Sequence, residues 1–183
     1  MSKPELADLE EIARKAGKIL RESYGKQHEV ELKGVIDPVT EVDRRSEVFI
    51  LNQINERFPN HSILAEESGA EDKDKEHLWY VDPLDGTVNY AHGVPIFSIS
   101  IAYAHKGQMM LAVVYDPMRD ECFSAERSKG ACLNGNPIHV SEETELGQSL
   151  LVTGFPYDTW DNPENNLDNF ARFALLTRGV RRL

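Results

Sequence analysis

WYVDPLDGTVNY, residues 79–90, joins a short apolar run to two aspartates that stand three residues apart. Residues 78–81 have the length and composition of a buried strand, and the strand ends at Asp82 and Asp85. A glycine and a threonine follow directly. Asp-Pro and Asp-Gly are common turn dipeptides, so an ordinary turn is one interpretation of this stretch. A strand that delivers acids to a functional site is the other.

A second apolar run ends in the same way, because Ile63-Leu64-Ala65 is followed by Glu66. Two neighbouring strands with acids at their ends can bring Glu66, Asp82 and Asp85 to one point. Three carboxylates repel each other unless a cation lies among them, and such hard oxygen ligands favour Mg²⁺, Mn²⁺ or Ca²⁺. The six histidines are scattered along the sequence without the spacing typical of zinc ligands.

Gly86 and Thr87 are suited to binding an anion beside such a metal. Glycine allows the backbone to approach a ligand closely, and Thr87 begins a segment that we expect to form a helical turn. The N–H groups at a helix start bind phosphate. Metal ligands next to an anion site are the arrangement for metal-assisted phosphoryl hydrolysis.

A further acidic stretch, DPVTEVD, occupies residues 37–43. Thr40 followed three residues later by Asp43 is nearly a capping box, which would make both residues part of a helix start. A catalytic role for Asp43 is the alternative, and the residues alone leave both interpretations open.

Periodicity predicts a layered α/β or α+β domain. Helical spacing of apolar residues predicts helices from Leu6 to the glycine at 25 and from Val42 to Phe58. Strands are predicted at 62–65, 78–82, 98–105, 109–115 and 121–125, with turns typical of an antiparallel meander. A further strand is expected at 149–155, and Asn162-Pro163 predicts the start of a helix that runs to Arg178. We expect a first domain over residues 1–145 and the beginning of a second α/β domain over residues 146–183.

Composition excludes several classes of protein. The sequence has 183 residues, of which 40% are apolar, so a packed core is feasible. No apolar run approaches a membrane span, and the N-terminus lacks the stretch of a secretory signal. The two cysteines form no CxxC pair, which favours a cytoplasmic, reduced protein. The net charge of −11 disfavours direct binding of nucleic acid or of anionic membranes.

The ordered set of motifs resembles the inositol monophosphatase family of magnesium-dependent phosphatases. The motifs are DPVTEVD (37–43), ILAEES (63–68), WYVDPLDGTVNYAHGVPIFSISIA (79–102) and GACLNG (130–135). The resemblance covers essentially the whole chain and implies an αβαβα layered sandwich, Mg²⁺, sensitivity to lithium, homodimers and a small phosphorylated substrate. It implies hydrolysis of myo-inositol monophosphate, with fructose-bisphosphatase, histidinol-phosphatase and nucleotide 3′-phosphatase activities left open. A protein-binding role in transcription, as described for some bacterial relatives, is a further alternative.

The resemblance also implies roles for individual residues. Glu66, Asp82, the backbone carbonyl of Leu84 and Asp85 become metal ligands, with Asp82 bridging two metals. Substrate binding falls to Asp85, Gly86 and Thr87, and the catalytic residues are Glu66, Thr87 and Asp43. In these roles Thr87 and Glu66 position the attacking water, and Asp43 orients Thr87 through a hydrogen bond. Lys33 is assigned to a segment that approaches the site.

One departure from the family pattern concerns a later Trp-Asp motif, whose aspartate completes the second metal site. The sequence ends at residues 181–183, before that region is expected, so the resemblance is to the first two-thirds of the enzyme. Trp160-Asp161 has the same two residue types, but it follows a predicted strand and not a helix of small residues. We therefore interpret Asp161 as a capping or loop acid. We therefore expect this chain alone to hold a second metal poorly and to show little turnover.

Overall fold

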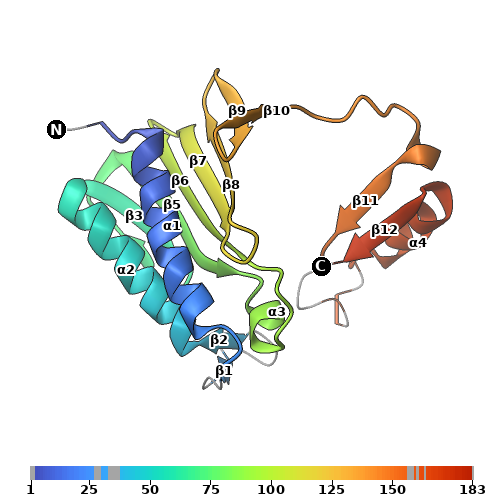
Figure 1. The fold of residues 1–183 in the computed structure, drawn as a ribbon, viewed down its shortest axis with the longest axis horizontal. Helices are drawn as coiled ribbons and strands as arrows, with labels where there is room; N and C mark the ends of the chain where they lie inside the picture. The colour runs from blue at the N-terminus through green and yellow to red at the C-terminus, as the bar shows by residue number, and fades with distance from the viewer. Residues whose placement is uncertain are drawn as a thin grey trace. The chain divides into compact units, whose positions relative to one another are not determined.

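A computed structural model describes residues 3–26, 30–32, 38–155, 159, 161–162 and 164–182, with the backbone alone at 30–32 and 38–40. The chain divides into two compact units (Figure 1). The first extends to Ile138 and the second begins at His139. Lys33 lies outside the described residues, as does the side chain of Thr40.

The first unit is built on an eight-stranded sheet with the strand order β10-β9-β8-β7-β6-β5-β3-β4. β3 and β5 are parallel neighbours, and all other pairs in this sheet are antiparallel. The predicted meander is therefore confirmed from β5 to β8. The bounds are β3 His61–Ala65, β4 Gly69–Glu71, β5 Asp74–Asp85, β6 Ser98–His105, β7 Gln108–Asp116, β8 Glu121–Glu126, β9 Gly130–Leu133 and β10 Asn136–Ile138. A separate antiparallel pair joins β1 (Val30–Leu32) to β2 (Pro38–Thr40).

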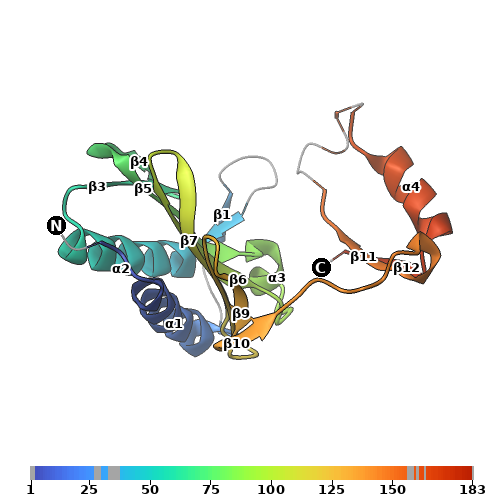
Figure 2. The same ribbon diagram turned by 90° about the horizontal axis from the view of Figure 1, so that it is seen from above.

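Two helices, α1 (Leu6–Ser23) and α2 (Glu41–Arg57), cover the same face of this sheet (Figures 1 and 2). Most of their apolar residues recur at helical spacing and are buried, with Val48 of α2 as an exposed exception, and the two helices pack on β5, β6 and β7. Both helices were predicted. α1 begins at Leu6, and Glu5 is its N-cap, which exchanges hydrogen bonds with Asp8 in a capping box.

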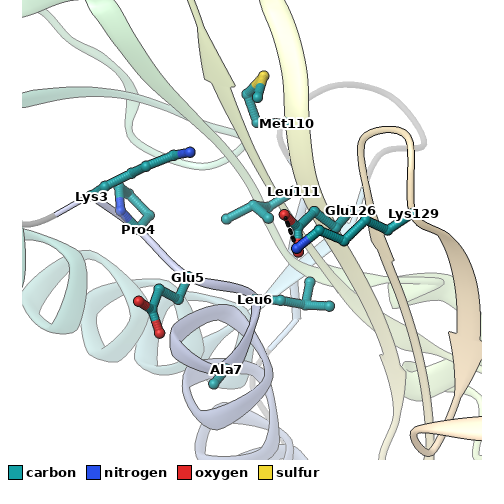
Figure 3. A pocket seen from close by; sticks show the side chains of 9 residues that line it. All are labelled: Lys3, Pro4, Glu5, Leu6, Ala7, Met110, Leu111, Glu126 and Lys129. Carbon is teal, nitrogen blue, oxygen red and sulfur yellow. Dashed lines mark ion pairs between the residues drawn. The ribbon is translucent and has the colours of Figure 1, made fainter.

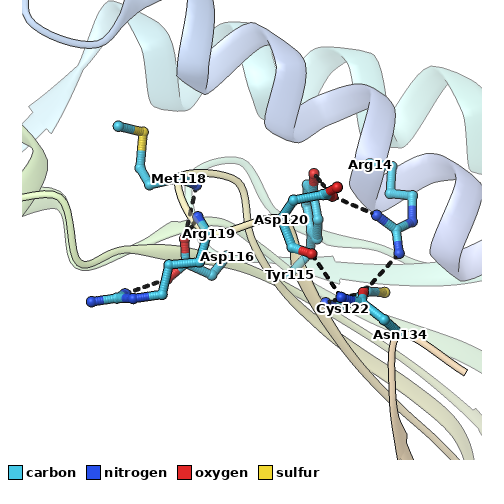
Figure 4. Close-up of polar contacts among 8 residues, drawn as sticks. All are labelled: Arg14, Tyr115, Asp116, Met118, Arg119, Asp120, Cys122 and Asn134. Atoms are coloured by element: carbon cyan, nitrogen blue, oxygen red, sulfur yellow. Dashed lines mark hydrogen bonds and ion pairs between the residues drawn. The ribbon is translucent and has the colours of Figure 1, made fainter. Parts of the chain in front are cut away.

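A polar network fastens α1 to the strands beneath it (Figure 4). The Arg14 guanidinium donates hydrogen bonds to Asp120 Oδ1 at 2.7 Å and to Asn134 Oδ1 at 3.0 Å, and it lies over the Tyr115 ring. The Tyr115 hydroxyl donates to Asp120 at 2.9 Å. Because these partners belong to β7 and to the turns before β8 and β10, the network fixes the helix against one half of the sheet.

The second unit contains a parallel pair, β11 (Leu150–Thr153) and β12 (Gly179–Arg182), together with a 3₁₀ turn at Leu146–Gln148 and the helix α4 (Leu167–Leu176). The strand predicted at 149–155 is present but shorter. The predicted helix start at Asn162 is wrong. Asn162 Oδ1 instead accepts the N–H of Glu164 at 2.9 Å, a local hydrogen bond that competes with helix formation. α4 begins only at Leu167. None of the described helices has the length and apolar character that crossing a membrane requires.

A hollow of about 420 Å³ lies between the start of α1 and the strands β7 and β8 (Figure 3). Residues 3–7 line one side, and Met110, Leu111, Glu126 and Lys129 line the other. Lys129 and Glu126 form an ion pair at 2.8 Å. No residue predicted for the functional site lines this hollow.

Candidate metal and phosphate site

The parallel pairing of β3 with β5 brings the two acidic strand ends together. Ala65 is the register partner of Val81, and the N–H of Glu66 donates to the carbonyl of Val81 at 3.0 Å. Glu66 therefore follows β3 at the level where β5 reaches Asp82. This is the consequence of two parallel strands that end in acids, because the carboxyl ends of parallel neighbours lie at the same edge.

The electrostatics of this edge are dominated by Asp82. Burial, the carboxylate of Glu66 and the charge of Asp85 together raise the pKa of Asp82 to about 8. A hydrogen bond from the N–H of Leu84 to Asp82 Oδ1 at 3.1 Å opposes this effect. Three carboxyl groups thus interact at one edge of the sheet, and a proton or a cation relieves their repulsion.

The backbone between the two aspartates is strand with an irregularity, and the simple-turn interpretation is wrong. β5 continues to Asp85, but its register against β6 shifts between Asp82, opposite Ser100, and Asp85, opposite Ser98. Such a bulge re-aims side chains next to functional sites. The Leu84 side chain is buried while its carbonyl accepts a hydrogen bond from the Thr87 hydroxyl at 2.9 Å.

Gly86 ends the strand in a conformation that requires glycine. Its φ is +92°, and a Cβ at this position would lie 3.1 Å from the carbonyl oxygen of Ile96 and 3.3 Å from Phe97 Cα. The five-residue helix α3 (Thr87–Ala91) follows, and the N–H of Tyr90 donates to the Gly86 carbonyl at 3.0 Å. The chain therefore turns sharply from strand to helix at the point predicted for phosphate binding.

The Thr87 hydroxyl lies between two acceptors, Asp43 Oδ1 at 3.0 Å and the Leu84 carbonyl at 2.9 Å. Asp43 is on the first turn of α2 and is only 1% exposed. The contact that the family resemblance implied between Asp43 and Thr87 is therefore present in the structure. The catalytic role of both residues stays a prediction.

The donor set fits a hard cation better than zinc, since it consists of carboxylates and one backbone carbonyl. Among the residues that the structure describes, however, no three His, Cys, Asp or Glu side chains are arranged round one point as metal ligands. Glu66 and Asp85 are exposed and Asp82 is half-buried. The carboxyl groups of Glu66 and Asp82 nevertheless lie within hydrogen-bond reach of each other, and this contact contributes to the raised pKa of Asp82.

The raised pKa of Asp82 predicts how the stability of the chain depends on pH when chelator removes divalent cations. The folded state keeps a proton that the unfolded chain releases near its ordinary pKa of about 4. The free energy of unfolding should therefore fall as pH rises from about 4 to about 8 and then level off. The slope stays below about 1.4 kcal/mol per pH unit, because Asp82 is partly exposed and solvent screens its neighbours.

Urea unfolding in EDTA from about pH 5 to about pH 8 measures this dependence. Other groups titrate as well, so the informative quantity is the difference between the unmodified chain and Asp82→Asn. The unmodified chain should lose more stability across this range than the variant does. Parallel curves would contradict the electrostatic description of the site.

A layered sheet with helices on one face, and with acids gathered where two neighbouring strands end beside a Gly-Thr turn, agrees with the fold and the site layout that the resemblance indicated. The model of the inositol monophosphatase family matches residues 3–183. The chain belongs to the inositol monophosphatase family.

Individual relatives agree with this assignment. The chain is 45% identical over 169 residues to an inositol-1-monophosphatase of Synechocystis and 41% identical over 177 residues to the Nus factor SuhB of Pseudomonas aeruginosa. These matches cover 91% and 93% of the chain, but the chain spans only 59% and 65% of the two relatives. A crystal structure of the extragenic suppressor protein suhB from Bartonella henselae superimposes with a TM-score of 0.90 at 35% identity, over 96% of this chain and 69% of that one. The predicted fold class is confirmed.

The structure also reveals two polar residues near the site that sequence reasoning missed. Ser46 and Glu47 are buried on α2, three and four residues after Asp43. The available signal was their spacing, because residues at i, i+3 and i+4 share one face of a helix. Asp161 lies in a turn of the second unit and is exposed, and its interpretation as a loop or capping acid stays a prediction.

Proposed function

We propose that the protein that carries this chain hydrolyses small phosphate monoesters with Mg²⁺ and that myo-inositol monophosphate is its preferred substrate. The observation that carries the proposal is the cluster of Glu66, Asp82 and Asp85 at one sheet edge, beside the Thr87–Asp43 hydrogen bond. Family membership supports the phosphatase activity, and the choice of substrate rests on the Synechocystis relative's name.

In this proposal Glu66, Asp82, Asp85 and the carbonyl of Leu84 hold the metal. Bound Mg²⁺ supplies Lewis-acid polarisation of the phosphate oxygens. The Leu84 carbonyl oxygen would be free to contact the cation when the single hydroxyl proton of Thr87 is donated to Asp43. Because the pKa of Asp82 is raised, its carboxyl group would have to lose a proton in order to hold a cation at neutral pH.

The remaining residues act on the phosphate and on the attacking water. Gly86 and Thr87 present backbone N–H groups at the start of α3, where a phosphate oxygen accepts hydrogen bonds. Asp43 accepts a hydrogen bond from the Thr87 hydroxyl at 3.0 Å, which leaves the oxygen lone pairs of Thr87 to orient the water. Glu66 accepts a proton from that water, since a carboxylate within hydrogen-bond reach can serve as a general base.

Further properties of the protein are part of the same proposal. We infer a cytoplasmic homodimer that lithium inhibits, as the family resemblance implies. A small phosphorylated substrate is the expected ligand, and the net charge of −11 disfavours direct binding of nucleic acid.

A panel of phosphate monoesters tests the proposal. Release of inorganic phosphate is measured with and without Mg²⁺ for inositol 1-phosphate, fructose 1,6-bisphosphate, histidinol phosphate and a nucleoside 3′-phosphate. We expect a requirement for Mg²⁺ and the highest kcat/KM with inositol 1-phosphate. Preference for another member of the panel would reassign the substrate, and release that EDTA leaves unchanged would contradict the metal-dependent mechanism.

A role in transcription is the second candidate, and the relative named Nus factor SuhB favours it. The acidic surface fits a basic protein partner better than nucleic acid. Salt-sensitive binding of a protein of the transcription machinery by Asp85→Asn, a form expected to lack hydrolysis, would support this role. If Asp85→Asn neither hydrolyses phosphate monoesters nor binds such a protein, the phosphatase activity remains the proposed function.

A further inference from the structure

Three polar residues on one face of α2 are almost completely removed from solvent. Asp43, Ser46 and Glu47 are 1%, 0% and 4% exposed. Burying polar side chains costs free energy unless each is hydrogen-bonded, so their partners explain why they are there. The Asp43 carboxylate accepts the hydrogen bond from Thr87, which places one of the three against the predicted site.

Ser46 holds the backbone of the bulge in β5. Its hydroxyl donates to the carbonyl of Pro83 at 3.0 Å in a buried contact. Pro83 stands between the two predicted metal ligands Asp82 and Leu84. The hydrogen bond therefore fixes the peptide segment from which a carboxylate and a carbonyl are presented.

Glu47 holds the turn that follows β3. Its Oε2 accepts the N–H of Glu67 at 2.9 Å, and its Oε1 accepts the N–H of Ser68 at 3.0 Å. Both carboxylate oxygens are used, and hydrogen bonds to an ionised acceptor are stronger than neutral ones. The two amides directly follow Glu66 along the chain, so Glu47 fixes the backbone on which the Glu66 side chain is mounted.

We propose that Glu47 is a positioning residue for the metal site. Its hydrogen bonds to the amides of Glu67 and Ser68 fix the direction of the Glu66 side chain. On the same face of α2, Ser46 fixes the bulge in β5, and Asp43 fixes the Thr87 hydroxyl. α2 thereby holds three segments of the site that are far apart in sequence in one fixed arrangement. This inference rests on the proposed function, because it assigns Glu47 to the metal site proposed there.

A carboxylate is required at this position for a geometric reason. Two backbone N–H groups point at two oxygens, and a glutamine offers one oxygen and one NH₂ group. Glu47→Gln therefore places a donor against one of the two N–H groups, and that part-buried amide loses its acceptor in the protein. Because the shape of the side chain is preserved, the substitution changes the two hydrogen bonds to the Glu67 and Ser68 amides and leaves the packing volume unchanged.

The experiment measures Mn²⁺ binding to the full chain by electron paramagnetic resonance and exchange of the Glu67 and Ser68 amide hydrogens. Glu47→Gln should weaken Mn²⁺ binding by about tenfold or more, the usual effect of removing a group that orients a metal ligand. Both amides should exchange faster. Glu47 makes no proposed contact with the metal, so the loss of affinity has to pass through Glu66.

Asp116 offers a matched control (Figure 4). Its Oδ1 accepts the N–H groups of Met118 and Arg119 at 2.8 and 3.0 Å, so one oxygen holds two amides at another turn, while its Oδ2 pairs with the Arg119 guanidinium at 2.6 Å. Asp116→Asn removes the charge of a carboxylate that holds a turn away from the predicted site residues, and it should leave Mn²⁺ affinity within about twofold of the unmodified chain. None of the described hydrogen bonds of Asp116 reaches a predicted site residue.

The outcomes separate this inference from the proposed function. If the unmodified chain binds Mn²⁺ and Glu47→Gln binds it equally well, Glu47 is only a structural residue and the inference is overturned. If the unmodified chain does not bind Mn²⁺, the proposed metal site itself fails and the inference fails with it. Should Glu47→Gln not fold, Glu47→Asp replaces it, because the shorter carboxylate keeps the charge but cannot reach both amides, and the same loss of affinity is expected.

Discussion

Replacement of Asp82 by asparagine should reduce phosphate release by several orders of magnitude in the protein that carries this sequence. Asp82 lies at the centre of the acidic cluster and is the carboxylate that the family resemblance assigns to both metals, so its loss affects the whole site. Asparagine has the same shape and is neutral at every pH, so it removes an ionisable group from a crowded edge. The fold should therefore survive, and we expect no loss of thermal stability.

Turnover of inositol 1-phosphate across a titration of Mg²⁺ measures this effect. Glu126→Gln is a suitable control, because Glu126 ends a strand of the same sheet but pairs with Lys129. The control should retain its activity. Near-normal turnover of Asp82→Asn at saturating Mg²⁺ would rule out the metal assignment.

Thr87→Ala should lower kcat more than it raises KM. The hydroxyl is proposed to orient the attacking water, an interaction that contributes in the transition state more than in substrate binding. Asp43→Ala should have a similar effect, since Asp43 acts through the 3.0 Å hydrogen bond to Thr87. The double variant should then lose little more activity than either single variant.

A double-mutant cycle on kcat distinguishes this coupling from a structural role of Asp43. Losses that multiply across the two sites would show that Asp43 serves only as an acid at the start of α2. Thr87→Ser supplies the conservative comparison, because it keeps the hydroxyl and should retain most of the activity. Equal losses in Thr87→Ser and Thr87→Ala would assign the effect to the methyl group instead.

The parts of this structure that follow from sequence are those with regular periodicity. The two helices that cover the sheet were predicted from apolar spacing, and the meander from β5 to β8 was predicted from alternating runs joined by turns. The convergence of Glu66 and Asp82 also follows from pattern, since two apolar strands end in acids. What the pattern could not give was the pairing of β3 with β5, which makes them parallel neighbours.

The short elements were missed for physical reasons. β4 and β10 have three residues each and are largely exposed, so they carry no apolar alternation that could indicate a strand. α4 begins at Leu167 because asparagine side chains before it bond to nearby backbone N–H groups, and Asn165 Oδ1 accepts the N–H of Leu167. Whether an asparagine side chain or a helix carbonyl accepts these N–H groups depends on local backbone geometry, which the sequence does not specify.

The buried polar face of α2 shows the same limit within the site. Ser46 and Glu47 look like solvent-facing residues in sequence, because polar residues at helix positions usually face water. Their partners are backbone groups of Pro83, Glu67 and Ser68, and backbone groups leave no signature in the residue types. Only the folded arrangement reveals that these two residues support the site.

The most direct test of the central claim is the location of Mn²⁺ by anomalous scattering in crystals of this chain and of Asp82→Asn. The account predicts an anomalous peak in contact with Glu66, Asp82 and the Leu84 carbonyl in the unmodified chain, and no peak there in the variant. A peak bound elsewhere, or one that keeps its place and height in Asp82→Asn, would contradict it.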